Sequence, residues 1–197
     1  MNVRVSDVVS LVLNPSVMTG VFFYFLAAEY EPRDAWRVGH IALSVVFATL
    51  VPVGLVFLLK SRGTLRDINM SVRTERERLY LLCTAGYTVG VVLLFFLRAH
   101  WTLWGFLACH IPNTLAILAV NCRLKISIHS MVLTGLFVAS MIFFGRQTAP
   151  VGILVLVAAW ARWDAGNHSP TELICGALVG GVLTSIEIFA LKALFAR

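Results

Sequence analysis

Long apolar stretches separated by short polar segments dominate this sequence and limit what the chain can fold into. A helix that crosses a bilayer needs about 20 consecutive, largely apolar residues. Seven stretches meet or nearly meet this requirement: 8–29, 38–59, 79–97, 101–121, 127–144, 148–161 and 171–194. Such helices satisfy their own backbone hydrogen bonds in lipid, so the sequence predicts an all-α, polytopic membrane helix bundle with six or seven transmembrane segments. The length of 197 residues favours a single domain covering 1–197.

Two of the seven stretches are irregular. Asn14 and Pro15 interrupt the first, so we expect residues 5–13 to form a separate interfacial helix and the span to begin at Pro15. This stretch is too long for the core of a cleavable signal peptide, and we expect it to be retained. The stretch 148–161 is short for a span, which makes six segments the alternative count.

The composition supports the same class of protein. Hydrophobic residues make up 59% of the chain and charged residues only 13%, which excludes a disordered chain and a water-soluble enzyme with a polar surface. A net charge of +6 would suggest a nucleic acid partner in a soluble protein, but few charges here lie outside short loops. We therefore expect no nucleic acid partner, and we expect the excess of Lys and Arg to face anionic lipid headgroups or a phosphorylated ligand.

The cysteines and glycines of the apolar stretches indicate packing rather than chemistry. The four cysteines have no C-x-x-C spacing and are Cys83, Cys109, Cys122 and Cys175. They are expected to be small buried side chains, without a disulfide or a zinc site. Gly176 and Gly180 lie four residues apart in the last stretch, which favours close packing of that helix against a neighbour.

Three polar segments carry most of the reactive side chains: 60–78, 122–130 and 162–172. Two predicted spans separate the first segment from the second, and two more separate the second from the third. An even number of crossings returns the chain to the same membrane face, so these segments and the N-terminus are expected to share one surface. That surface has more Lys and Arg than the opposite one, and the positive-inside rule predicts that it is cytoplasmic.

The shared surface holds the groups that phosphoryl chemistry requires. The candidates are Arg66, Arg73, Lys125, Ser127 and Arg162 for phosphate binding, and His129, His168 and Glu172 for catalysis. Arginine forks match phosphate oxygens in pairs, and several cations together make a phosphate receptor. The two histidines offer a nucleophile and a general acid. Glu172 follows His168 by four residues and would orient its ring, as the third member of a catalytic triad does.

The same residues allow other interpretations. His129 by itself would also fit an interfacial histidine bonded to the backbone. Ser169, Pro170 and Glu172 form a capping box, so the carboxylate could serve the start of a helix. A metal site made of His129, His168 and Glu172 is a further alternative, but the cations around it would repel a divalent ion. Three ionisable residues inside the apolar stretches are assigned to packing or left without a role: His40, His110 and Glu187.

At these residues the pattern resembles the type-2 phosphatidic acid phosphatase superfamily, which includes lipid phosphate phosphatases and vanadium haloperoxidases. The third motif of that superfamily is S-R, five residues, H, three residues and D. Ala161 and Arg162, followed by His168 and Glu172, have the same spacing, with Ala in place of Ser and Glu in place of Asp.

The other two motifs resemble this sequence less closely. The second motif, P-S-G-H, looks like I-S-I-H at 126–129, which keeps Ser127 and His129. The string KISIHS is similar to a variant found in some small bacterial and archaeal members. The first motif, K, six residues, R-P, is similar in spacing to Arg66 and Arg73, with Arg in place of Lys. The resemblance covers residues 66–172, with the motifs in the order of the superfamily.

The resemblance implies an integral membrane phosphatase that needs no metal or other cofactor and acts on a lipid or isoprenoid phosphate or diphosphate. His168 would attack phosphorus to form a phosphohistidine. His129 would protonate the leaving alkoxide and then activate water. The expected partners are the lipid phosphate substrate and membrane lipids, in the cell membrane. The alternative is a non-catalytic protein of the same fold that binds or transports lipid phosphates, which would not need both histidines.

Overall fold

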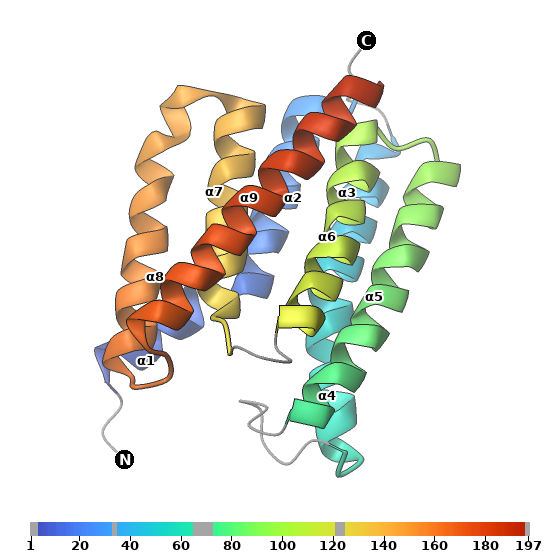
Figure 1. The fold of residues 1–197 in the computed structure, drawn as a ribbon. Helices are drawn as coiled ribbons and strands as arrows, with labels where there is room; N and C mark the ends of the chain where they lie inside the picture. Colours follow the sequence, from blue (N-terminus) through green and yellow to red (C-terminus); the bar gives the residue numbers. More distant parts are fainter. Residues whose placement is uncertain (1–3, 33–34, 65–72, 121–124, 196–197) are drawn as a thin grey trace. The chain divides into compact units, whose positions relative to one another are not determined.

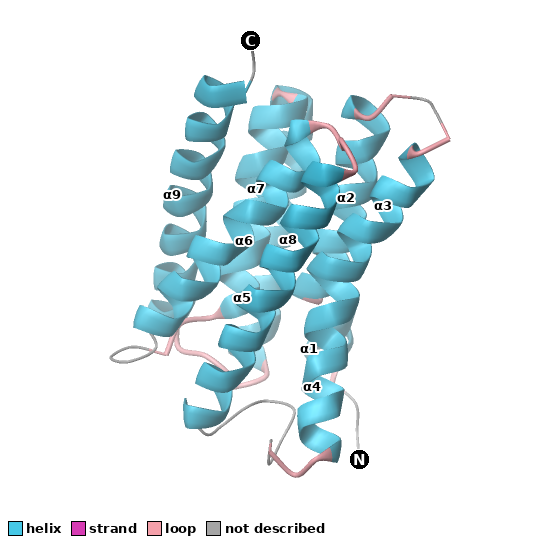
Figure 2. Ribbon diagram, turned by 90° about the vertical axis from the view of Figure 1, so that its right-hand side faces the viewer, coloured by secondary structure: helices cyan, strands magenta, loops and turns pink. Residues whose placement is uncertain are grey.

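The structure is a computed structural model that describes residues 4–32, 35–64, 73–120 and 125–195. Within these ranges the chain consists of helices and the loops that connect them, and no residue is in a β-strand (Figure 2). The prediction of an all-α fold is therefore confirmed.

The helices follow the predicted apolar stretches closely (Figure 1). In chain order they are α1 (Val5–Val12), α2 (Pro15–Tyr30), α3 (Arg37–Val45), the π-helical turn η1 (Val46–Leu50), α4 (Val51–Ser61), α5 (Arg73–Phe96), α6 (Trp101–Val120), α7 (Ile128–Phe144), the 3₁₀ segment η2 (Arg146–Val151), α8 (Gly152–Asp164) and α9 (Pro170–Phe195). The chain divides into two compact units, one made of 1–19 and 123–197 and the other of 20–122.

Five helical segments among the described residues are long and apolar enough to cross a membrane. They are Val5–Tyr30, Arg37–Ser61, Glu77–Phe96, Trp101–Val120 and Pro170–Phe195. Helix α7 is apolar but has 17 residues, and α8 has 13. The architecture is therefore that of a membrane-embedded helical protein, with five segments of sufficient length against the six or seven that the sequence predicted.

The exposed faces of the helices support this conclusion. On α9 the residues Ile174, Leu178, Val182 and Ile186 recur every fourth position, and each is 55–62% exposed. The buried face of the same helix contains Gly176, Gly180 and Thr184. An apolar stripe on the outside and small residues on the inside are typical of a helix whose outer surface meets lipid.

The break predicted at Asn14 and Pro15 is present. Helix α1 ends at Val12, and α2 begins at Pro15. Proline lacks the N–H that a continuous helix would need, but it is well suited to the first position of a new one. The side-chain Oδ1 of Asn14 accepts a hydrogen bond from the backbone N–H of Ser16 at 2.9 Å, which satisfies a donor at the start of α2.

In the unit formed by 20–122, the intramembrane histidines have structural partners. His40 Nδ1 lies 3.2 Å from Glu31 Oε2, and both side chains are buried. Oε1 of Glu31 also accepts from the backbone N–H of His100 at 2.6 Å. His110 bonds the carbonyl of Phe106 at 3.0 Å through Nδ1. These contacts support a packing role for His40 and His110.

In the other unit, α9 crosses α7 at close range (Figure 1). The crossing depends on the glycines that the sequence predicted to pack closely. A Cβ on Gly176 would lie 2.5 Å from the backbone oxygen of Ser127, and a Cβ on Gly180 would collide with the backbone of Met131. The backbone of α7 therefore rests directly on α9, which brings the start of α7 next to the start of α9.

Candidate functional site

Four segments of one unit meet where the predicted catalytic residues lie. They are the beginning of α7, the end of α8, the loop 165–169 and the beginning of α9. Ser127 and the first turn of α9 are joined directly, because the backbone N–H of Ser127 donates to the backbone oxygen of Glu172 at 3.1 Å. Residues 125–130 and 162–172 therefore lie close together, while the expectation that the three polar segments and the N-terminus share one membrane face stays a prediction.

His168 and Glu172 form a hydrogen-bonded pair. Nδ1 of His168 lies 3.0 Å from Oε2 of Glu172, and the two side chains are 9% and 21% exposed. An ionised carboxylate can only accept, so Nδ1 carries the proton and Nε2 of the neutral ring has a free lone pair. The pair therefore has the geometry that prepares a histidine to act as a nucleophile through Nε2.

The capping box is also present, and it uses the same carboxylate oxygen. Glu172 Oε2 accepts from the backbone N–H of Ser169 at 3.1 Å, and Ser169 Oγ lies 3.4 Å from the backbone N–H of Glu172. The sequence left open whether Glu172 serves the helix start or His168. The structure shows that it does both, so the N-terminus of α9 holds the pair of His168 and Glu172 in a fixed orientation.

Two cations lie near His168. Lys125 Nζ donates to the backbone oxygen of Asn167 at 3.1 Å, which places the ammonium group over the loop that carries His168. Arg162 is partly buried, and its Nε has no hydrogen-bond partner among the described residues. A buried guanidinium nitrogen without a protein acceptor can bind an anion.

These surroundings determine the charge state of His168. Burial lowers the pKa of the His168 imidazole below its ordinary value, and the positive charges of Arg162 and Lys125 act in the same direction. The bond to Glu172 opposes them only in part. His168 is therefore neutral near pH 7, which is the form that has a free lone pair on Nε2.

His129 lies in the first turn of α7, within electrostatic range of both Arg162 and His168. The backbone of Ser10 in α1 also lies within range of the ring. The two interpretations of His129, as a general acid and as an interfacial histidine bonded to the backbone, stay predictions.

Ser127 is fully buried at the N-cap position of α7, where its Oγ accepts from the backbone N–H of Ser130 at 3.4 Å. The structure therefore assigns this hydroxyl a capping contact, and its role as a phosphate ligand stays a prediction. Arg66 and the side chain of Arg73 lie outside the described residues, so their roles also stay predictions. The backbone of Arg73 forms the first residue of α5.

The metal alternative for His129, His168 and Glu172 finds no support in the geometry. Among the described parts of the chain, no three His, Cys, Asp or Glu side chains gather as ligands. The Glu172 oxygen that faces His168 already accepts two hydrogen bonds.

Helix α1 is the part of the site that the sequence analysis did not identify. It packs against α8, and its Ser10 backbone lies within range of the His129 ring. Asp7, one turn earlier, interacts electrostatically with Arg162. Every residue has a backbone carbonyl, so the sequence does not indicate which carbonyl lies at a site. The polar residues Ser6, Asp7 and Ser10 in an otherwise apolar helix were the available signal.

An open groove of about 550 Å³ runs between α7 and α9, lined by Thr134, Val138 and residues of α9 from Ile174 to Ile186. It contains none of the candidate catalytic residues. Its lining belongs to the apolar outer stripe of α9, so its surroundings in a membrane would be hydrocarbon. The candidate residues lie in the polar cluster and not in this groove.

Comparison of the chain with protein-family models, with curated proteins and with solved structures finds no match in any of the three.

Proposed function

We propose that the protein is an integral membrane phosphatase that hydrolyses a lipid or isoprenoid phosphate or diphosphate through a phosphohistidine intermediate. The observation that carries the proposal is the bond from His168 Nδ1 to Glu172, which leaves Nε2 as a nucleophile beside two cations. A role limited to capping the helix would not require a histidine with this pairing.

The first chemical step forms a bond from Nε2 of His168 to phosphorus and breaks the bond from phosphorus to the lipid oxygen. The departing alkoxide takes a proton from His129, whose imidazolium form the bound phosphate dianion favours. In the second step the neutral His129 takes a proton from water as the water oxygen bonds phosphorus. The bond from phosphorus to Nε2 of His168 then breaks and inorganic phosphate is released. Glu172 stabilises the positive charge that develops on the His168 ring. Arg162 and Lys125 bind the phosphoryl oxygens as their charge redistributes. The same role for Arg66 and Arg73 stays a prediction from the sequence.

The proposal includes six or seven membrane spans. The 17 residues of α7 reach about 26 Å along the helix axis, and η2 with α8 reaches about 31 Å, close to a hydrocarbon core of about 30 Å. Both would then cross the bilayer with modest local thinning. The reacting groups lie at helix ends, at the depth where lipid phosphates reside.

The proposal also places the site on the cytoplasmic face of the cell membrane. Single cysteines at Ser61 and at the exposed Asp164, in a protein whose native cysteines are replaced by alanine, test this placement. An impermeant thiol reagent should label neither residue in intact cells and both in lysed cells. Labelling of both in intact cells would reverse the orientation. Labelling of only one would contradict the seven-span count, which places four spans between the two residues, and would favour six spans.

The activity itself is tested by phosphate release from purified protein in lipid nanodiscs. The panel contains phosphatidate, phosphatidylglycerophosphate, polyprenyl phosphate and polyprenyl diphosphate, with His168→Ala as the matched control. Release from at least one substrate, lost in the control, supports the proposal. Saturable binding of a lipid phosphate without release by either protein would instead identify a binding or transport protein.

A further inference from the structure

The apolar groove between α7 and α9 has a volume of about 550 Å³, within the range of about 300–1,000 Å³ that ligand sites occupy. Its lining on α9 alternates small and large side chains. The small ones recur every fourth residue, and the large ones do the same one position later: Ala177, Gly181 and Ser185, and Leu178, Val182 and Ile186. The small side chains leave the space beside α7 unfilled, and this space is the groove.

The lining offers a ligand only apolar contacts. The hydroxyl of Thr134 is buried, and its methyl group is the part that approaches α9, since a Cβ on Gly181 would lie 3.3 Å from Cγ2 of Thr134. The hydroxyl of Ser185 donates to the backbone oxygen of Gly181 at 2.7 Å. Neither hydroxyl of the lining is therefore presented to a ligand, which suits a hydrocarbon chain.

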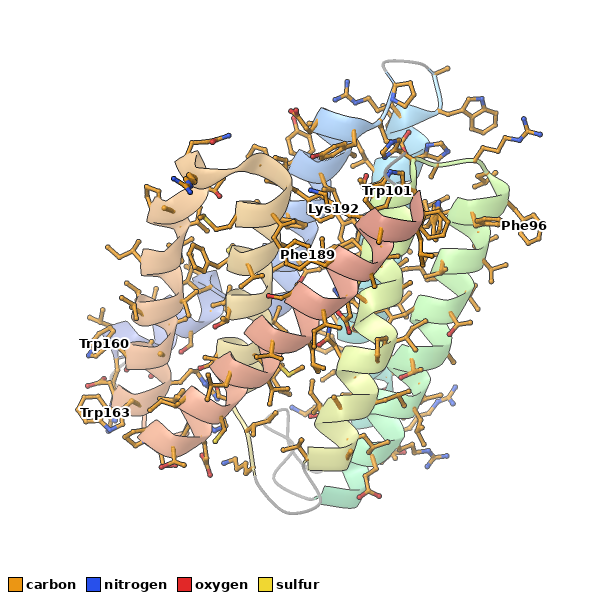
Figure 3. All side chains as sticks on the ribbon, turned by 45° about the horizontal axis from the view of Figure 1, so that its top comes forward. Phe96, Trp101, Trp160, Trp163, Phe189 and Lys192 are labelled. Carbon is orange, nitrogen blue, oxygen red and sulfur yellow. The ribbon has the colours of Figure 1, made fainter. Side chains whose placement is uncertain are left out.

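The ends of α8 and α9 show where the groove lies in a bilayer. Trp160 and Trp163 are 44% and 58% exposed and project outward near the end of α8, while Lys192 lies near the far end of α9 (Figure 3). Tryptophan and the ends of long lysine side chains prefer membrane–water interfaces. Because the loop 165–169 joins the end of α8 to the start of α9, the groove-lining part of α9, 174–186, lies between residues typical of the two interfaces.

Both helices that line the groove begin at the candidate site. The exposed ammonium group of Lys125, three residues before α7, donates to the backbone oxygen of Asn167 in the loop before α9 at 3.1 Å. The lining begins at Ile174, two residues after Glu172. The groove thus leads toward an end of the helix pair that holds a cation and the proposed nucleophile His168. Charge and polarity are arranged to match an amphiphile with an anionic head.

The length of the groove matches one leaflet of a bilayer. From Ile174 to Ile186, α9 rises about 18 Å along its axis, and half of a hydrocarbon core of about 30 Å is about 15 Å. A lipid chain whose phosphate lay beside His168 could therefore follow the groove through most of its leaflet.

We propose that the groove between α7 and α9 seats the hydrocarbon chain of the lipid phosphate substrate, with the phosphate group at the end where Lys125 and His168 lie. The inference rests on the proposed phosphatase function and narrows its substrate to an amphiphile with at least one long chain. Seating the chain holds the phosphate in place for attack, so that chain length and not only the head group determines turnover.

The functional test fills the groove. Ala177→Phe is the filling variant, and Ala190→Phe makes the same change at an exposed position of α9 beyond the groove as the matched control. Two substrate pairs, each with a shared head group, isolate the chain: dioleoyl and dibutyryl phosphatidate, and a long polyprenyl phosphate and dimethylallyl phosphate.

In nanodiscs, Ala177→Phe should lower hydrolysis of the long-chain member of a pair by about 10²-fold, the loss expected when a reacting group is misplaced by about 1 Å. Hydrolysis of the short-chain member should be unchanged, and Ala190→Phe should leave both unchanged. Equal loss for both members in Ala177→Phe, or no loss for either, would overturn the proposal.

A second measurement uses the unaltered chain and does not depend on turnover. Analogues of phosphatidate and of polyprenyl phosphate with a photoreactive diazirine in mid-chain are irradiated in nanodiscs of phosphatidylcholine. We expect crosslinks within 174–186 or at Thr134 and Val138, prevented by the unlabelled lipid phosphate and not by more phosphatidylcholine. Crosslinks that no lipid phosphate prevents would identify bulk lipid and overturn the proposal. Competed crosslinks in a protein that releases no phosphate would support the chain site and contradict only the phosphatase function.

A second copy of the chain is the other occupant that small residues on a membrane helix allow. The mass of the protein in detergent, measured by light scattering, separates this case. We expect the same oligomeric state for the wild-type protein and Ala177→Phe. A dimer that Ala177→Phe converts to a monomer would assign the groove to an interface between copies and overturn the proposal.

Discussion

Nδ1 of His168 lies 3.0 Å from Oε2 of Glu172, and that same oxygen accepts the backbone N–H of the residue that caps α9. One carboxylate therefore fixes both the start of a helix and the tautomer of the proposed nucleophile. The arrangement couples the chemistry to the fold, because rotation of the His168 ring breaks a hydrogen bond to the carboxylate that also caps the first turn of α9.

The two roles of Glu172 can be separated by mutation. Glu172→Gln keeps an oxygen that accepts from Nδ1 but removes the negative charge that stabilises the His168 cation. We expect kcat to fall by about 10²–10⁴-fold, as when the carboxylate of a catalytic triad is made neutral. Single-turnover phosphate release measures this change.

Ser169→Ala is the control, because Ser169 caps the helix without contacting the ring of His168. It should cost about 1 kcal/mol of stability while the activity per folded molecule is retained. If the two variants lose activity equally, Glu172 acts only through the helix start and the catalytic role assigned to it is wrong.

The pH dependence follows from the surroundings of His168. Burial lowers its pKa, and Lys125 and Arg162 lower it further, so the nucleophile stays neutral below the ordinary histidine value of about 6.5. When the pH is lowered, activity should therefore be lost only as the pH falls through the lowered pKa of His168. Below a pH of about 6.5, His168 binds a proton in the unfolded chain more readily than in the folded site. The free energy of unfolding should therefore also decrease as the pH falls.

Lys125 offers a direct test of the charge effect. Lys125→Gln removes a cation that disfavours protonation, so the pKa of His168 should rise and the acid limb of kcat/KM should move to higher pH. Because Lys125 is exposed, the shift should be small and should shrink at high salt. Arg146→Gln, which changes an exposed cation in η2, should leave the limb in place. An unchanged limb in Lys125→Gln at low salt would contradict the proximity of the two groups.

The sequence predicted the helices well because each is a long apolar run bounded by polar residues. In lipid such a run folds as a helix, which satisfies its own backbone hydrogen bonds. It also predicted the capping box and the close approach at Gly176 and Gly180, which are local patterns. It did not predict that the backbone N–H of Ser127 would donate to the backbone oxygen of Glu172, or that α1 would pack against α8. Those contacts join residues far apart in sequence, and the first uses backbone groups, which have no side-chain signature.

The packing of α7 on α9 predicts a contrast between two adjacent glycines. A methyl group on Gly180 would collide with the backbone of Met131, whereas one on Gly181 would lie 3.3 Å from the flexible Thr134 side chain. Gly180→Ala should therefore lose about 1–3 kcal/mol of stability, as overpacked cores do, and Gly181→Ala much less. Unfolding in mixed detergent micelles measures both. Equal stability would show that the two helices do not approach as closely as described.

Chelation and vanadate test the kind of phosphoryl transfer. The proposed nucleophile is a histidine beside cations, so EDTA should leave the activity unchanged. Vanadate adopts the five-coordinate geometry of the transition state and should inhibit at concentrations well below those of inorganic phosphate. Loss of turnover on chelation, restored by added magnesium or zinc, would contradict this mechanism.

The sharpest prediction separates the two histidines through the leaving group. His168→Ala should abolish hydrolysis of every phosphomonoester, because no phosphoenzyme can form. His129→Ala should reduce lipid phosphate hydrolysis by about 10²–10⁴-fold, since a lipid alkoxide needs a proton in the transition state and a nitrophenolate does not. With nitrophenyl phosphate, rapid mixing should therefore show a burst of nitrophenol in His129→Ala, followed by slow turnover because water is not activated, and no burst in His168→Ala. The reverse pattern would exchange the roles of the two residues. Equal, full activity in both variants would contradict the catalytic roles of both histidines and the phosphohistidine mechanism.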